Sequence, residues 1–500
     1  MVNRLLTKSN YLLGLQCPKL LWVAKNDKTR ISEPDKATKA RFEAGDIIGV
    51  LATKVFPGGV DLSGMGFMEN INATKEAVKN RQTIYEAGFM IDDLFSRGDI
   101  LLPVGEDEWD IIEVKSATRV KDVNIHDVSF QKYTYKKAGL KIRNCVLMHI
   151  NNQYIKNEEI EPKGLFVQTG INDKVLEYSE GIQERISDMQ KNLNSDEPKF
   201  KIGTYCSDPY DCPLMDECWK DVPPANVFEF YRMFNKKCFE LHDRGIVCLN
   251  EVPEDIKLNN KQKIQRRLAM TSKETHSKEN NGKKYIDKQE IKKFLGNLQY
   301  PIYYLDFETI NPAIPKFDGM KPYQRIPFQF SLHIQKEERG ECEHISFLAE
   351  GTSDPRPKFM QALKDNLGGS GSILVYNQGF EKGVMNEGCN AFPEFRMWYD
   401  ENIFHRIKDL WDVFKDFSYY DPKQKGSTSI KYVLPVMSDL SYSEMDIKNG
   451  AIASLEYERV TYENIEDSER NNVRDNLEEY CKMDTWAEVE IVRALINLCD

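Results

Sequence analysis

Two carboxylates interrupt an apolar and aromatic run in the sequence "YYLDFETI", residues 303–310. Side chains alternate between the two faces of a strand, so Asp306 and Glu308 would leave one face while Leu305 and Phe307 leave the other. Neighbouring acids repel each other, and burying them without partners is costly. We therefore expect a cation between them if that face is buried. An edge strand with a solvated face is the ordinary interpretation of a lone D-x-E pair.

A second set of chemically active residues lies in "RGDILLPVGEDEWDIIEVKS", which predicts a β-hairpin. Asp99 begins one strand, and Glu113 and Lys115 share one face of its antiparallel neighbour. Two carboxylates can hold a divalent metal ion, and a lysine beside them can position or deprotonate a water molecule. The helix expected at residues 126–138 could present Gln131 to the same face. A salt-bridged surface hairpin is the alternative interpretation.

Four cysteines form a third set. Cys206, Cys212 and Cys218 are evenly spaced in "YCSDPYDCPLMDECW", and Cys17 stands far upstream in "LQCPKLLW". Thiolates are soft ligands that suit zinc or an iron–sulfur cluster. The other seven of the eleven cysteines are scattered, and we interpret them as buried apolar thiols.

The elements that must position these residues form an α/β multi-domain protein, because 500 residues exceed one core of ordinary size. We expect an α/β domain at residues 1–222, a helical basic connector at 223–299 and a second α/β domain at 300–500. No run approaches the roughly 18 apolar residues of a membrane span, and the N-terminus lacks the features of a signal peptide. The sequence predicts a cytoplasmic protein that does not bind membranes.

The net charge of −11 does not by itself suggest a polyanionic partner. The charge is unevenly distributed, however: residues 257–293 hold 12 Lys/Arg and 4 Asp/Glu, whereas residues 451–500 hold 5 and 13. The basic stretch is either a solvated linker or an arm that faces phosphates.

Residues 1–220 resemble the RecB-type PD-(D/E)XK nucleases, in which a D-hairpin-E-x-K motif precedes a helix with Q-x-x-x-Y, here "DVSFQKYTYKKAG". The resemblance implies a restriction-endonuclease-like fold in which Asp99 and Glu113 bind the metal ion and Lys115 is catalytic. Gln131 and Tyr135 match the supporting helix. An upstream acid usually completes the metal shell in that family, and the residues that could supply it here are Glu43, which we prefer, and Glu33 or Asp46.

The cysteine pattern resembles CRISPR-associated and AddB-type RecB nucleases, which carry an iron–sulfur cluster on one cysteine before the hairpin and three after it. This implies a 4Fe-4S cluster on Cys17, Cys206, Cys212 and Cys218. The family triplet often contains a tighter C-x-x-C, so the cluster type is open and zinc is the alternative.

Residues 300–500 resemble the DnaQ-like 3′–5′ exonucleases of the DEDDy kind, which have an RNase H-like fold. The motifs that carry the resemblance are the D-x-E pair, Glu381 in "ILVYNQGFEKG", and Tyr480 with Asp484 in "EEYCKMDTWAEVEIV". It implies that Glu381 and Asp484, together with Asp306 and Glu308, bind two Mg²⁺ or Mn²⁺ ions, and that Tyr480 orients the attacking water. The family has aspartate where this chain has Glu381. The stretch "MKPYQRIPFQFSLH" is also similar to an uncharacterised domain family that accompanies RecB-type nucleases.

These observations predict a metal-dependent nuclease with two sites that acts on nucleic acid, with single-stranded DNA favoured over RNA. One alternative keeps a single catalytic domain, with the other binding nucleic acid or protein; another is an RNA-processing exonuclease. A third is a non-catalytic, cluster-bearing scaffold, although a scaffold has no need for a lysine aimed at two metal-binding acids.

Overall fold

The computed structural model describes residues 5–271 and 284–500. The chain divides into two compact units, one comprising residues up to Asp221 together with Pro312–Gln324, and the other comprising Val222–Asn311 and Arg325–Asp500. Each unit combines a mixed β-sheet with helices, as expected for a multi-domain α/β protein. None of the described helices combines the length and the apolar character needed to cross a lipid bilayer.

The first unit is built on a seven-stranded sheet in the order β2-β3-β4-β5-β6-β7, with β1 beside β4. The predicted hairpin is present, because β4 and β5 pair antiparallel, whereas β5 and β6 run parallel. The strands are β1 (Leu6–Thr7), β2 (Val60–Asp61), β3 (Ile84–Ile91), β4 (Leu94–Val104), β5 (Glu108–Lys115), β6 (Lys141–Ile150) and β7 (Phe166–Gly170).

Helices cover both faces of this sheet. Ile111 packs with Val128 of α5 on one face, whereas Ile112 and Val114 pack with Ile48 of α3 on the other. This alternation sends Glu113 and Lys115 to the α5 face. The helices are α1 (Lys8–Gln16), α2 (Pro18–Asn26), α3 (Lys36–Thr53), α4 (Phe67–Lys79), α5 (Asp122–Lys137), α6 (Pro162–Leu165), α7 (Asn172–Ser179), α8 (Ile182–Leu193) and α9 (Met215–Cys218).

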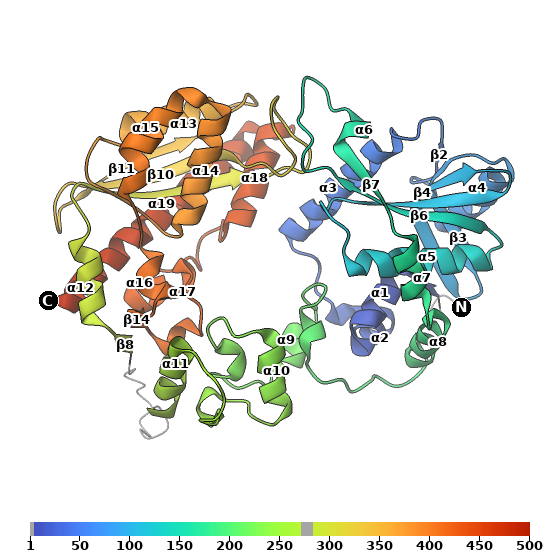
Figure 1. The fold of residues 1–500 in the computed structure, drawn as a ribbon, viewed down its shortest axis with the longest axis horizontal. Coiled ribbons are helices and arrows are strands. Elements are labelled where there is room, and N and C mark those ends of the chain that lie inside the picture. The colour runs from blue at the N-terminus through green and yellow to red at the C-terminus, as the bar shows by residue number, and fades with distance from the viewer. Residues whose placement is uncertain (1–4, 272–283) are drawn as a thin grey trace. The chain divides into compact units, whose positions relative to one another are not determined.

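The second unit has a five-stranded sheet in the order β11-β10-β9-β12-β13 and a two-stranded sheet of β8 and β14 (Figure 1). β10 pairs antiparallel with both β9 and β11, whereas β12 is parallel to β9 and to β13. The strands are β8 (Tyr285–Ile286), β9 (Ile302–Ile310), β10 (Ile326–Gln335), β11 (Cys342–Leu348), β12 (Ser372–Val375), β13 (Ile407–Asp409) and β14 (Tyr419–Tyr420).

The two faces of the five-stranded sheet differ in polarity. Leu305 and Phe307 lie in the apolar core with helices α13 and α14, which lie over the sheet in Figure 1. The opposite face packs on α19, where Gln329 donates a hydrogen bond to the Leu477 carbonyl at 2.8 Å and Ser331 hydrogen-bonds to Thr485 at 2.7 Å. The helices are α10 (Asn235–Asp243), α11 (Asn260–Thr271), α12 (Lys288–Gly296), α13 (Arg356–Asn366), α14 (Gln378–Ala391), α15 (Arg396–Trp398), α16 (Trp411–Lys415), α17 (Ile430–Met437), α18 (Gly450–Tyr462) and α19 (Asp467–Cys499).

The described part of the basic stretch belongs to this second unit. In α11, Gln265 is buried and donates a hydrogen bond to the Glu229 carbonyl at 2.8 Å, and Lys261 forms an ion pair with Asp416 at 3.1 Å. Residues 272–283, which hold three of the 12 basic residues of this stretch, lie outside the described residues. Helix α11, the first part of the stretch, is therefore packed against other residues of the second unit.

Candidate metal sites

The clearest metal-binding geometry lies in the second unit. One carboxylate oxygen from each of Asp306, Glu308 and Asp484 lies within 4.8 Å of the other two, and no other described residues group His, Cys, Asp or Glu ligands in this way. Strand β9 supplies the first two acids and α19 supplies the third. Residues separated by almost the whole unit therefore meet at one point, which we call the C-terminal acid site.

Two further acids lie near this site. Glu381, near the start of α14, and Glu488, one turn beyond Asp484 on α19, are each 1% exposed. One oxygen, Oε2, of each carboxylate has no hydrogen-bond partner. Glu381 is thus buried near the three acids of the site but does not belong to their group. The sequence analysis missed Glu488, although its i+4 spacing from Asp484 places it on the same helix face.

Two residues, Tyr442 and Lys431, partly offset the negative charge of the acids, and the sequence analysis predicted neither of them. Tyr442 donates a hydrogen bond from its hydroxyl to Asp484 Oδ1 at 2.7 Å. The Lys431 ammonium lies 5.4 Å from the Tyr442 ring centroid and 5.5 Å from that of Tyr480, and it interacts electrostatically with the three acids of the site. One lysine cannot balance five buried acids, so the site favours added cations.

Without a bound cation, burial and mutual repulsion favour the protonated form of these acids. Burial, followed by the charge of Asp484, raises the pKa of Glu308 to about 8. Burial also raises the pKa of Asp484 to about 6, although Tyr442 and Lys431 oppose the rise. The pKa of Asp306 lies well above its ordinary value, because of burial and then of the neighbouring acids. A divalent ion would replace these protons.

A pH dependence of stability follows. In the metal-free protein Glu308 stays protonated up to about pH 8, whereas the unfolded chain ionises it near 4.5, so its contribution to the free energy of unfolding is lost as the pH rises through that window. Glu308→Gln removes this titration, and we expect it to gain on the order of a few kcal/mol over the parent between pH 5 and pH 8. Thermal melting in EDTA measures the difference. A parent that gains stability relative to the variant over the same range would contradict the assignment.

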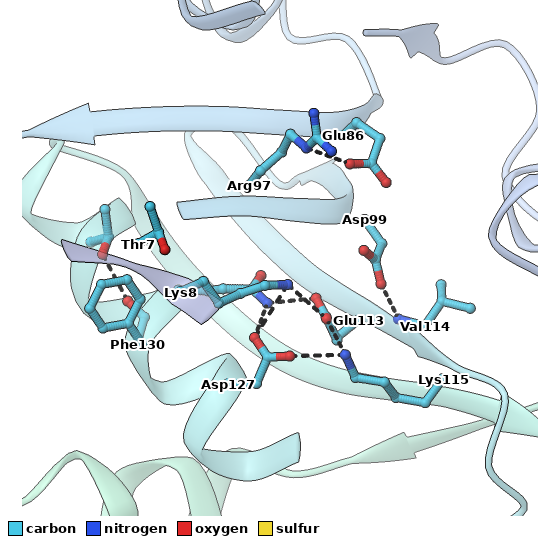
Figure 2. A network of polar contacts seen from close by, with 12 residues as sticks. Thr7, Lys8, Glu86, Arg97, Asp99, Glu113, Val114, Lys115, Asp127 and Phe130 are labelled. Atoms are coloured by element: carbon cyan, nitrogen blue, oxygen red, sulfur yellow. Dashed lines mark hydrogen bonds and ion pairs between the residues drawn. The ribbon is translucent and has the colours of Figure 1, made fainter. Parts of the chain in front are cut away.

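The first unit brings together the residues of the hairpin and α5, as Figure 2 shows. The Lys115 ammonium contacts Glu113 Oε1 at 2.6 Å and Asp127 Oδ2 at 2.9 Å. Gln131 donates to Glu113 Oε2 at 2.5 Å, and the Val114 amide donates to Asp99 Oδ2 at 2.6 Å. We call this group, together with Lys8, the N-terminal acid site.

Two members of the N-terminal acid site were not predicted. The Lys8 ammonium contacts Glu113 Oε1 at 2.9 Å and Asp127 Oδ1 at 3.3 Å. Burial alone would raise the pKa of Asp127, but Lys8 and then Lys115 outweigh it and hold the pKa below its ordinary value. Burial, together with Asp127 and Asp99, raises the pKa of Glu113 to about 7. Asp127 had a signal in the sequence, since it precedes Gln131 by one helical turn.

Tyr135 and Glu43 are two further residues that the sequence analysis singled out. Tyr135 is buried in the core, where its hydroxyl donates to the Ala87 carbonyl at 2.9 Å, so it supports β3. Glu43 is exposed on α3, and no contact among the described residues joins it to Asp99 or Glu113. The alternatives Glu33 and Asp46 are exposed as well.

The four cysteines line one enclosed cavity of about 20 Å³. Cys17 stands between α1 and α2, and the Cys212 amide donates to the Cys206 carbonyl at 2.8 Å, which closes the loop that carries the triplet. All four are free thiols, and burial raises the pKa of Cys212 to about 11. No three of their Sγ atoms lie within 4.8 Å of one another.

Ion pairs beside the cysteines join the segment that follows Cys17 to the segment that carries the other three cysteines. Arg30 contacts Glu197 at 2.8 Å and Glu217 at 2.6 Å, and Lys19 contacts Glu217 at 2.7 Å. The segment after α1 is thereby held against the segment that carries the cysteine triplet.

Part of the second unit is similar to a described protein family. A family described as "Domain of unknown function (DUF2779)" matches residues 303–429. That range begins at β9, contains Asp306, Glu308 and Glu381, and includes the stretch at 320–333 that was expected to resemble an uncharacterised domain family. It ends before the helix that carries Asp484.

Three distant relatives are uncharacterised proteins. One from Ureaplasma parvum is 26% identical over 222 residues, which are 39% of this chain and 31% of the relative. One from Mycoplasma genitalium is 26% identical over 215 residues, covering 39% of this chain and 32% of the relative. A homologue from Mycoplasma pneumoniae is 27% identical over 209 residues, covering 38% and 31%. The chain thus spans about a third of the length of the curated relatives it matches.

Proposed function

We propose that this protein is a metal-dependent nuclease that hydrolyses phosphodiester bonds of nucleic acid, and that the C-terminal acid site is its principal centre. The observation that carries the proposal is the meeting of Asp306, Glu308 and Asp484 within 4.8 Å. Three ionised acids this close repel one another, so they need bound cations or protons to be stable together. The DnaQ-like resemblance, with its RNase H-like fold and 3′–5′ polarity, supplies the reaction class.

The donor set fits Mg²⁺ or Mn²⁺, because these hard ions prefer carboxylate oxygens. When bound, such ions polarise the phosphoryl group and lower the pKa of water. Burial and the nearby Asp484 raise the pKa of Tyr480 far above neutrality, so this residue works as a neutral hydroxyl that can orient water. Lys431 supplies a positive charge beside the same acids, suited to a phosphate.

The N-terminal acid site supports a second nuclease centre of the RecB-like PD-(D/E)XK type. Asp99 and Glu113 would hold the ion, and Lys115, fixed between Glu113 and Asp127, would position water. Two lysines already offset the three acids here, whereas the C-terminal acid site has one lysine for five acids. This contrast favours the alternative in which only the C-terminal domain is catalytic and the first unit binds nucleic acid.

We further propose a metal at the four-cysteine site. In a tetrahedral zinc site the sulfur atoms lie about 3.8 Å apart, so the wider separation of these Sγ atoms favours a 4Fe-4S cluster. Zinc on the four thiolates is the alternative. Either metal would fasten α1 and α2 to the end of the unit. A brown protein with broad visible absorbance supports the cluster, and colourless protein with stoichiometric zinc rejects it.

Digestion of end-labelled single-stranded DNA and RNA tests the proposed function. The parent protein should release nucleotides from the 3′ end with Mn²⁺ and lose this activity in EDTA. Comparison of Lys115→Ala with Asp306→Ala shows which site is catalytic, because a loss of nuclease activity in only one variant identifies a single active centre. A parent protein that digests neither substrate supports the scaffold alternative.

A further inference from the structure

Lys8 contacts Glu113, one of the two acids proposed to hold a metal ion at the N-terminal acid site. It is the first residue of α1 and follows β1, the short strand beside β4. Its ammonium lies 2.9 Å from Glu113 Oε1 and 3.3 Å from Asp127 Oδ1, and its side chain is 20% exposed. Figure 2 shows this ammonium and that of Lys115 both directed at the same two acids.

Both oxygens of Glu113 are already engaged by protein donors. Oε1 accepts from Lys8 and from Lys115 at 2.6 Å, and Oε2 accepts from Gln131 at 2.5 Å. A carboxylate oxygen has two lone-pair positions, so Oε1 has no capacity left for an ion. Asp99 differs, because among the residues that the structure describes only its Oδ2 accepts a hydrogen bond, from the Val114 amide. Metal binding through Glu113 Oε1 therefore requires one ammonium to leave, whereas Oε2 keeps one unused lone-pair position.

The geometry favours Lys8 as the group that leaves. Lys115 belongs to β5, the same strand as Glu113, and its contacts with Glu113 and Asp127 are 2.6 Å and 2.9 Å. The corresponding contacts of Lys8 are longer, at 2.9 Å and 3.3 Å. Both lysines have the same flexible four-carbon stem, so the longer contacts of Lys8 are what favour its withdrawal.

We propose that Lys8 is an internal counter-ion that competes with the divalent ion for Glu113, and that metal binding at the N-terminal acid site displaces its ammonium. The proposal rests on the proposed function, in that this site binds a metal ion. Lys8 thereby neutralises part of the negative charge of the buried acids when no metal is bound, and it lowers the affinity of the site for a divalent ion. Two units of positive charge a few ångströms apart repel strongly, so removing the lysine charge strengthens metal binding.

Isothermal titration with Mn²⁺ tests the proposal, with every variant made in an Asp306→Asn background so that the C-terminal acid site contributes little heat. We expect Lys8→Met to bind Mn²⁺ about tenfold more tightly than the Asp306→Asn parent, and Lys8→Arg, which keeps the charge, to bind like that parent. The matched control is Lys137→Met, which removes a lysine from the exposed ion pair with Asp92 in the same unit. It should leave affinity unchanged.

Thermal stability is a second readout, and it does not require a heat of binding. Without metal, Lys8→Met should melt at a lower temperature than its parent, and Mn²⁺ should raise its melting temperature by more than it raises the parent's. If Lys8→Met does not fold, Lys8→Gln, which is neutral but keeps a donor, serves in both measurements. In crystals with Mn²⁺ bound to Asp99, the Lys8 ammonium should no longer contact Glu113.

The two possible failures are distinguishable. If the parent binds Mn²⁺ and Asp99→Asn abolishes that binding, but the neutral Lys8 variants bind no more tightly, the counter-ion proposal is wrong and the metal site stands. If Asp99→Asn removes no Mn²⁺ binding from the parent or from Lys8→Met, the metal site itself is wrong and the counter-ion proposal falls with it.

Discussion

Asp306→Asn is expected to reduce Mn²⁺-dependent digestion of single-stranded DNA at least about a hundredfold. The substitution keeps the shape of the side chain but removes the charge of the central acid in the group formed with Glu308 and Asp484. An amide oxygen is a much weaker ligand for Mn²⁺, so both ion affinity and turnover should fall. Initial rates of release from a 3′-labelled strand measure the effect.

The same variant should gain stability while it loses activity. Burial and neighbouring acids disfavour the ionised form of Asp306, so a neutral asparagine relieves repulsion in the metal-free protein. The matched control is Asp365→Asn, because Asp365 is exposed on α13 and accepts a hydrogen bond from Gln361. Full activity in Asp306→Asn, or an equal loss in the control, would reject the C-terminal acid site as the active centre.

Cys212→Ser is expected to have the second large effect, a loss of bound metal and of stability in the first unit. Four ligands around one cavity connect segments almost two hundred residues apart, so a missing ligand releases that link. A loss of roughly 3–5 kcal/mol would lower the melting temperature by about 10 °C. Metal analysis, visible absorbance and thermal melting measure the change.

Cys342→Ser is the control for this experiment, because Cys342 is a partly exposed free thiol in β11 of the other unit. It should keep the metal content and the melting temperature of the parent. Metal content unchanged in Cys212→Ser would show that these cysteines are ordinary buried thiols.

Much of the local structure could be predicted from residue patterns. The period-two alternation in "YYLDFETI" predicted that Leu305 and Phe307 leave one face of a strand while Asp306 and Glu308 leave the other, and the structure places both apolar residues in the core against α13. The hairpin and the α5 face were predictable for the same reason, because each pattern is local and periodic. The spacing of Tyr480 and Asp484 likewise predicted one face of a helix.

The remaining site residues depend on contacts that no local pattern encodes. Lys8 lies 105 positions from Glu113 in the chain, and Tyr442 lies 42 positions from Asp484 in an irregular segment. Neither position is part of a periodic motif, so only the fold reveals the pairing. Glu43 shows the converse: an acid placed by analogy with a family lies exposed on α3.

The position of bound Mn²⁺ is the most direct test of the central claim that distant acids of the second unit form one metal site. An anomalous difference map from crystals grown with MnCl₂ should show a peak within about 2.5 Å of carboxylate oxygens of both Asp306 and Asp484. Peaks found only elsewhere, with these two carboxylates bound to no ion, would contradict the account.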